Sequence, residues 1–173
     1  MAASKKSSSK KSSKKSSSKQ SSSAKRPADA IALLKQDHEN VRKLLAQLVS
    51  ASGARRTKLL GQIEQEVKVH STIEEEIFYP AYYQAARKKE DKQLFFEALQ
   101  EHHVVDLVMP EADEGASAEE LKAKAKVLRE LIEHHAEEEE KEMFPRARKA
   151  MDRDDLRALG EQMMRRKEDL MAR

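Results

Sequence analysis

The feature that most constrains this chain is a motif that occurs twice. The pattern His-x3-Glu-Glu-x3-aromatic-Pro runs from His70 to Pro80 and again from His135 to Pro145. In a helix, residues four apart stand one above the other, so each copy directs an imidazole and a carboxylate to the same place. Two such pairs in one chain predict a metal site built from nitrogen and oxygen ligands.

Apolar residues recur every three or four positions along most of the chain, which is typical of amphipathic helices. Ser117-Ala118-Glu119-Glu120 has the form of a capping box and Gly53 that of a residue that follows a helix. No segment shows the alternating apolar and polar residues that are typical of a β-strand. We expect helices over residues 29–52, 55–79 (extending to 88 if the helix continues past Pro80), 91–109, from 117 onward and 152–171. A Gly-containing turn is expected at 113–116.

Four long amphipathic helices with short connections predict an all-α fold, an up-down-up-down four-helix bundle with an extra C-terminal helix. The first 26 residues are almost entirely Ser and Lys and cannot bury enough surface to offset the entropy of ordering them. We therefore expect a disordered, basic Lys/Ser-rich tail at residues 1–27, the bundle at 28–149 and a helix packed on it at 150–173.

Composition excludes several classes of protein. The chain has no cysteine, which rules out disulfides, thiolate zinc sites and thiolate-bound iron–sulfur clusters. Residues 1–30 carry a net charge of +8 and the rest −5, although the whole chain has only +3. No apolar run approaches the roughly 18 residues of a membrane span, and no apolar segment follows the basic N-terminus as in a secretory signal. We expect a cytoplasmic protein that does not enter a membrane.

Ionisable residues interrupt the apolar stripe of every long helix. An unpaired buried carboxylate costs several kcal/mol or changes its protonation state, whereas one or two dications would turn such residues into ligands. The residues at these inward positions are His38, His70, Glu74, His102, Asp106, His135 and Glu139.

Each of these residues also has a simpler interpretation. A lone histidine such as His38 is more often a satisfied core residue than a ligand, and a lone Glu74 or Glu139 can reach water from the edge of a stripe. The joint pattern on four helices favours ligands.

The neighbouring residues have ordinary structural interpretations. We expect Tyr79 and Phe144 to cap the core, and the proline after each to end or kink its helix. The remaining acids of the second motif, Glu137, Glu138 and Glu140, are expected in solvent.

Together these residues resemble the hemerythrin family in its bacterial HHE cation-binding form. The resemblance is carried by Asp37-His38-Glu39, by the two repeated segments and by Glu101-His102-His103, and it covers about residues 28–146. It implies a four-helix bundle holding two non-haem iron ions, with manganese or zinc as the other candidate metals. The implied ligands are His38, His70, Glu74, His102, His135 and Glu139, with the two glutamates bridging the metals.

The third long helix departs from the oxygen-carrying members of the family, which place a second histidine one turn after their ligand. Here that position is Asp106, which could bind metal, hydrogen-bond a water on it or point away. We prefer His102 to its neighbour His103 as the ligand, because valines follow it with the spacing seen after His38. Ferritin-like di-iron proteins use Glu-x-x-His instead, acid first and three apart.

The resemblance implies a protein that binds or senses dioxygen or a related small oxidant such as nitric oxide or peroxide. The sequence contains no nucleophile–base pairing and no phosphate-cradling loop that would indicate another chemistry, and we expect a binding protein rather than an enzyme. The alternatives are a peroxidase-like or nitric oxide-detoxifying di-iron enzyme, an iron store or buffer, and a nucleic-acid-associated protein. In the last case the tail at 1–27 would contact phosphates without base specificity.

Overall fold

All regular structure in the described part of the chain is helical. The computed structural model describes Met1, residues 27–113 and residues 117–172, so the tail and most of the expected turn at 113–116 lie outside the described residues. The α-helices are α1 (Ala30–Leu48), α2 (Gly53–Ile73), α3 (Tyr79–Ala85), α4 (Lys89–Val108), α5 (Ala118–Glu138), α6 (Phe144–Ala150) and α7 (Arg153–Met171). A short 3-10 helix, Pro110–Asp113, follows α4.

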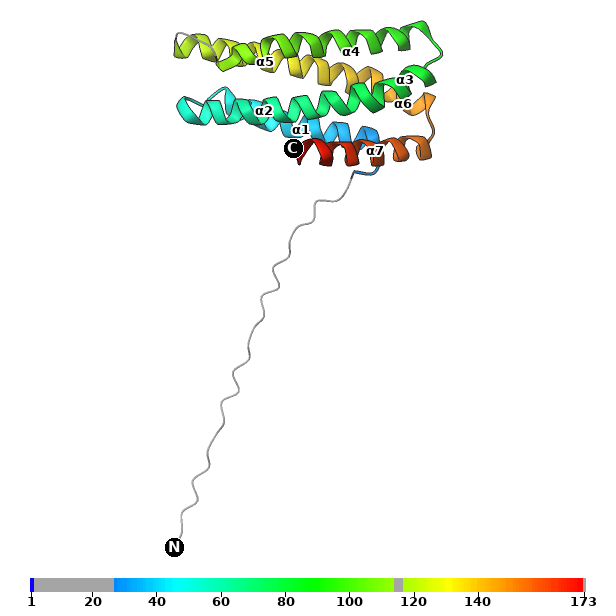
Figure 1. The fold of residues 1–173 in the computed structure, drawn as a ribbon, viewed down its shortest axis with the longest axis horizontal. Helices are drawn as coiled ribbons and strands as arrows, with labels where there is room; N and C mark the ends of the chain where they lie inside the picture. Colours follow the sequence, from blue (N-terminus) through cyan, green and yellow to red (C-terminus); the bar gives the residue numbers. More distant parts are fainter. Residues whose placement is uncertain (2–26, 114–116, 173) are drawn as a thin grey trace.

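The long helices run side by side, and α7 lies along them (Figure 1). Helix α1 packs against α2 and α5, and α4 packs against α5, so all four long helices contribute to one interior. Helix α7 contacts α1 and α2. None of the described helices is long and apolar enough to cross a membrane.

Local sequence sets the helix starts. Asp29 caps α1 by accepting a hydrogen bond from the Ala32 amide at 2.8 Å. Ser117 caps α5 by accepting one from the Glu120 amide at 3.1 Å, as the capping-box pattern predicts. Gly53 has φ +53°, a conformation that favours glycine, where the chain turns from α1 into α2.

Two five-residue π-helical segments interrupt the long helices, and they coincide with the two copies of the motif. We call Glu74–Phe78, between α2 and α3, the first π segment, and Glu139–Met143, between α5 and α6, the second. Pro80 and Pro145 do not end their helices, since a seven-residue helix that contains the proline follows each π segment, and the alternative of a helix that continues past Pro80 is the one observed. The wider π turn accommodates a proline, which has no amide hydrogen to donate to the preceding turn.

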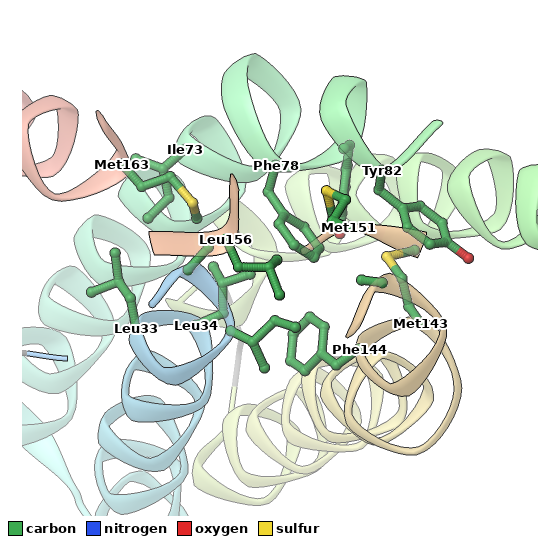
Figure 2. Close-up of a cluster of buried hydrophobic side chains, with 14 of the residues drawn as sticks. Leu33, Leu34, Ile73, Phe78, Tyr82, Met143, Phe144, Met151, Leu156 and Met163 are labelled. Atoms are coloured by element: carbon green, nitrogen blue, oxygen red, sulfur yellow. The ribbon is translucent and has the colours of Figure 1, made fainter. Parts of the chain in front are cut away.

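The interior consists of two apolar clusters separated by a polar layer. The first apolar cluster includes Leu34, Ile73, Phe78, Met143, Phe144 and Met163 (Figure 2). The second includes Val41, Leu45, Ile63, Val105 and Leu128. Along each long helix and its continuation, residues of one cluster precede the histidine and residues of the other follow it; on α1, for example, Leu34 and Val41 lie on either side of His38.

Candidate metal centre

Six predicted ligands meet in the polar layer between the two clusters. All six are buried. One group of potential ligand atoms, all within 4.8 Å of one another, comes from His38, His70, Glu74 and Glu139. A second group, sharing one glutamate with the first, comes from Glu74, His102 and His135.

The imidazoles form two pairs. The Nε2 atoms of His38 and His70 lie 3.1 Å apart, and so do those of His102 and His135. Two nitrogens this close either share one proton or both present lone pairs to the same cation. Each pair thus forms half of the centre, and we call these the His38/His70 half and the His102/His135 half.

The two glutamates lie between the halves. Glu74 Oε2 is 3.2 Å from Nε2 of His70 and 3.3 Å from Nε2 of His102. Glu139 Oε2 is 3.3 Å from Nε2 of His38 and 3.8 Å from Nε2 of His135. Each carboxylate therefore faces one imidazole of each half.

The outer nitrogen of every inward histidine faces a carboxylate from another helix. Nδ1 of His38, His102 and His135 lies 2.8 Å from a carboxylate oxygen, and Nδ1 of His70 lies 3.7 Å from one. A proton on Nδ1 leaves the Nε2 lone pair directed at the centre, the tautomer that binds a metal. The pairs are Asp37 with His70, Glu75 with His102, Glu101 with His135, and Glu140 with His38.

These contacts close a ring around the centre. They link α1 to α2, the end of α2 to α4, α4 to α5, and the end of α5 back to α1. We call the four acids the ring of carboxylates. The expectation that Glu140 is solvated is therefore wrong, because its Oε1 accepts from His38 and from Arg42 at 2.8 Å. The motif already contained part of this pattern, since the second Glu of each copy, Glu75 or Glu140, belongs to the ring.

The two buried glutamates differ in proton affinity. Burial and the neighbouring Glu139 raise the pKa of Glu74 well above its ordinary value. Burial acts in the same direction on Glu139, but the imidazoles of His135 and His38 outweigh it and hold the pKa of Glu139 below its ordinary value. Without a cation the pair keeps a proton, because two neighbouring buried carboxylates cannot both ionise.

The donor set fits metal ions. Glu74 Oε1 and Glu139 Oε2 are buried without a hydrogen-bond partner among the described residues, a state that a cation would relieve. Burial lowers the pKa of His70 to about 4, so this imidazole is neutral at pH 7, as a ligand must be.

Tyr79 is part of the centre, which the sequence did not indicate. Its hydroxyl donates to Glu139 Oε1 at 2.9 Å and lies 3.4 Å from Glu74 Oε2 and 3.3 Å from His102 Nε2. The first π segment explains this position: residues five apart are hydrogen-bonded there, and the Tyr79 amide donates to the Glu74 carbonyl. Burial and Glu139 raise the pKa of the Tyr79 hydroxyl well above its ordinary value, so it stays protonated.

Phe144 occupies the corresponding position after the second π segment. Its ring stacks on His38 with centroids 5.9 Å apart, as Tyr79 stacks on His102 at 5.5 Å. Because Phe144 carries no hydroxyl, the two halves differ chemically.

The two less certain candidates lie outside the centre. His103 and Asp106 are both exposed. The expectation that Asp106 lies in the core row is wrong, because the buried residues after His102 are Val105 on α4 and Met109 just after that helix.

A small cavity of about 30 Å³ adjoins the four imidazoles on the side of the second apolar cluster. One aliphatic residue three positions from each histidine lines it: Val41, Val67, Val105 and Ile132. A volume of this size holds a molecule no larger than one or two waters.

Comparison with known proteins agrees with this geometry. Residues 29–147 match the family described as the Hemerythrin HHE cation binding domain. Searches of curated proteins and of solved structures found no significant match.

Proposed function

Because the chain belongs to the hemerythrin HHE cation-binding domain family, we propose that it is a non-haem di-iron protein that binds or senses dioxygen or a related small oxidant. Nitric oxide and peroxide are the related oxidants. The proposal includes an up-down-up-down four-helix bundle as the scaffold of the centre and six metal ligands: His38, His70, Glu74, His102, His135 and Glu139.

The observation that carries the proposal is the position of Glu74 and Glu139. Each carboxylate faces one imidazole of each half, at 3.2–3.8 Å. This arrangement suits two cations bridged by two carboxylates better than a single ion. Imidazole and carboxylate ligands suit iron, manganese and zinc.

The cavity beside the imidazoles is an argument for a small molecule as the ligand. Its aliphatic side chains lie next to the imidazoles, and its volume of about 30 Å³ suits a diatomic molecule rather than an organic substrate. A pair of ferrous ions, when bound, supplies electrons to such an oxidant. The chain's own contribution is to hold the imidazoles in one tautomer, and to keep a proton on the Tyr79 hydroxyl.

Anaerobic loading with ferrous iron, followed by optical spectroscopy on admitting air, tests the proposal. We expect two iron ions per chain and a charge-transfer band that His135→Ala abolishes. His103→Ala, which changes an exposed histidine next to a ligand, is the matched control and should keep the band. Wild-type protein that stays helical but takes up no metal would refute the proposal.

The same preparation separates the alternatives. Iron content well above two per chain would indicate storage or buffering. Turnover of peroxide or nitric oxide by the iron-loaded protein would indicate an enzyme.

The charge distribution favours a second function, non-specific association with nucleic acid through residues 1–27. Residues 1–30 carry +8, while the remainder of the chain is acidic. Lysine-rich arms contact phosphates without reading bases, and such binding weakens as salt rises. Retention on DNA at low salt should fall when residues 1–26 are deleted, and unchanged retention would exclude this function.

A further inference from the structure

Helix α7 lies beyond the residues that match the family, yet it is seated closely on the helices that hold the centre. It packs against α1, α2 and the first π segment. Gly160 brings it against the start of α1, where an added Cβ would lie 2.7 Å from the Ala30 nitrogen. Leu156 and Met163 are buried in the first apolar cluster. This packing defines the position and rotation of α7.

The same face of α7 places a lysine at the ring of carboxylates. Lys167, four residues after Met163, donates from Nζ to Asp37 Oδ1 at 2.6 Å. Asp37 is buried, and the Lys167 side chain is only 19% exposed. Nζ also lies 3.8 Å from Glu66, so the ammonium group is held between α1 and α2.

Asp37 in turn faces His70. Its Oδ2 lies 3.7 Å from His70 Nδ1, and neither atom has a hydrogen-bond partner among the described residues. Asp37 is thus the group that can orient His70, and Lys167 holds Asp37. This distance is longer than the 2.8 Å of the other three imidazoles, so the position of the Asp37 carboxylate decides whether it can accept a hydrogen bond from His70 Nδ1.

Among the described residues, Lys and Arg side chains pair with the carboxylates of only one half of the centre. In the His38/His70 half, Lys167 pairs with Asp37 and Arg42 pairs with Glu140. In the described ranges, no Lys or Arg forms an ion pair with Glu75 or Glu101, the carboxylates that serve the other half.

We propose that Lys167 is a positioning residue of the metal centre: from α7 it fixes Asp37, and through Asp37 it orients His70. The inference rests on the proposed metal-binding function. It makes the affinity of the His38/His70 half depend on a helix outside the matched domain.

Titration of the metal-free full chain with Zn²⁺ against a competing chelator tests the proposal, because it reports affinity without oxygen chemistry. Lys167→Met should weaken one of two bound Zn²⁺ measurably, by up to about 10–100-fold, the loss that follows removal of a group hydrogen-bonded directly to a ligand. The other ion should bind as in the wild type. Lys167→Arg, which keeps the charge, should restore the weakened step.

Arg166→Met is the matched control. Arg166 is the neighbour of Lys167 on α7 and pairs with Glu76, at 2.6 and 2.8 Å, rather than with the ring of carboxylates. It should leave both affinities unchanged, which separates the effect of Lys167 from a general loosening of α7.

A double-mutant cycle shows whether Lys167 acts through Asp37. Asp37→Asn alone should weaken the same ion, and adding Lys167→Met should then have little further effect. Equal Zn²⁺ affinities in wild type and Lys167→Met, or equal losses in Lys167→Met and Arg166→Met, would overturn the inference while leaving the metal centre intact. A wild-type chain that binds no metal would instead overturn the proposed function.

Discussion

At the scale of single residues, each inward imidazole uses both of its nitrogens. Nε2 faces the centre and Nδ1 faces a carboxylate from a neighbouring helix. The inward histidines could be predicted from sequence because they interrupt an apolar stripe. Their carboxylate partners could not, since Glu75 and Glu140 stand in runs of acids that are ordinarily solvated. Only the separation of the helices decides which acid of a run reaches an imidazole.

The Tyr79 hydroxyl provides a prediction at this scale. Tyr79→Phe removes the hydroxyl that donates to Glu139 Oε1, so this buried oxygen loses that hydrogen bond. We expect the metal-free protein to lose about 1–3 kcal/mol of unfolding free energy, measured by urea denaturation.

Tyr82→Phe is its matched control. The Tyr82 hydroxyl is buried without a hydrogen-bond partner among the described residues, so its removal should cost little or stabilise the protein. Equal losses in the two variants would contradict the assigned role of the Tyr79 hydroxyl.

At the scale of secondary-structure elements, the π segments do what a regular helix could not. In an α-helix, residues five apart point in different directions, so Tyr79 would turn away from Glu74. The π hydrogen bond from the Tyr79 amide to the Glu74 carbonyl brings them together, and Phe144 relates to Glu139 in the same way. The prolines mark both places in the sequence, but a proline alone does not distinguish a kink, an end and a π turn.

The docking of α7 provides a prediction at this scale. Gly160→Ala places a Cβ 2.7 Å from the Ala30 nitrogen, where backbone rather than a flexible side chain would have to move. We expect a loss of about 1–3 kcal/mol of unfolding free energy, measured by urea denaturation.

Gly61→Ala is the comparison. Gly61 lies within α2, and a Cβ there would meet nothing within 4 Å. This variant should gain about 0.5–1 kcal/mol, because alanine favours a helix over glycine. If both substitutions changed the unfolding free energy in the same direction, close packing of α7 on α1 would not explain the effect of Gly160→Ala.

At the scale of the whole molecule, a charged layer divides the interior into two apolar clusters. All four long helices cross this layer at a histidine, and Glu74 and Glu139 add carboxylates with a buried oxygen that has no hydrogen-bond partner among the described residues. The folded state therefore gains from cations that the unfolded chain cannot hold in this geometry.

Metal removal provides the prediction at this scale. When the free metal concentration is 100 times the dissociation constant, each bound ion should add about 2.7 kcal/mol to the free energy of unfolding. Thermal unfolding followed by circular dichroism, which suits a chain without tryptophan, should show a higher midpoint with Zn²⁺ and its reversal by chelator. The midpoint of His135→Ala should rise much less on adding Zn²⁺. Identical wild-type midpoints with and without metal would contradict a metal centre built into the core.

The sequence by itself determined the helical class and the ligand candidates, because helical periodicity repeats within each helix and a histidine in an apolar stripe interrupts it locally. The repeated motif also indicated that two helices serve one site. Only the tertiary structure decided that Tyr79 joins the centre, that Asp106 does not, that the ring of carboxylates closes, and that Lys167 of α7 supports Asp37. These contacts join residues distant in the chain, and they depend on how the helices rotate and separate when they pack, which no local pattern specifies.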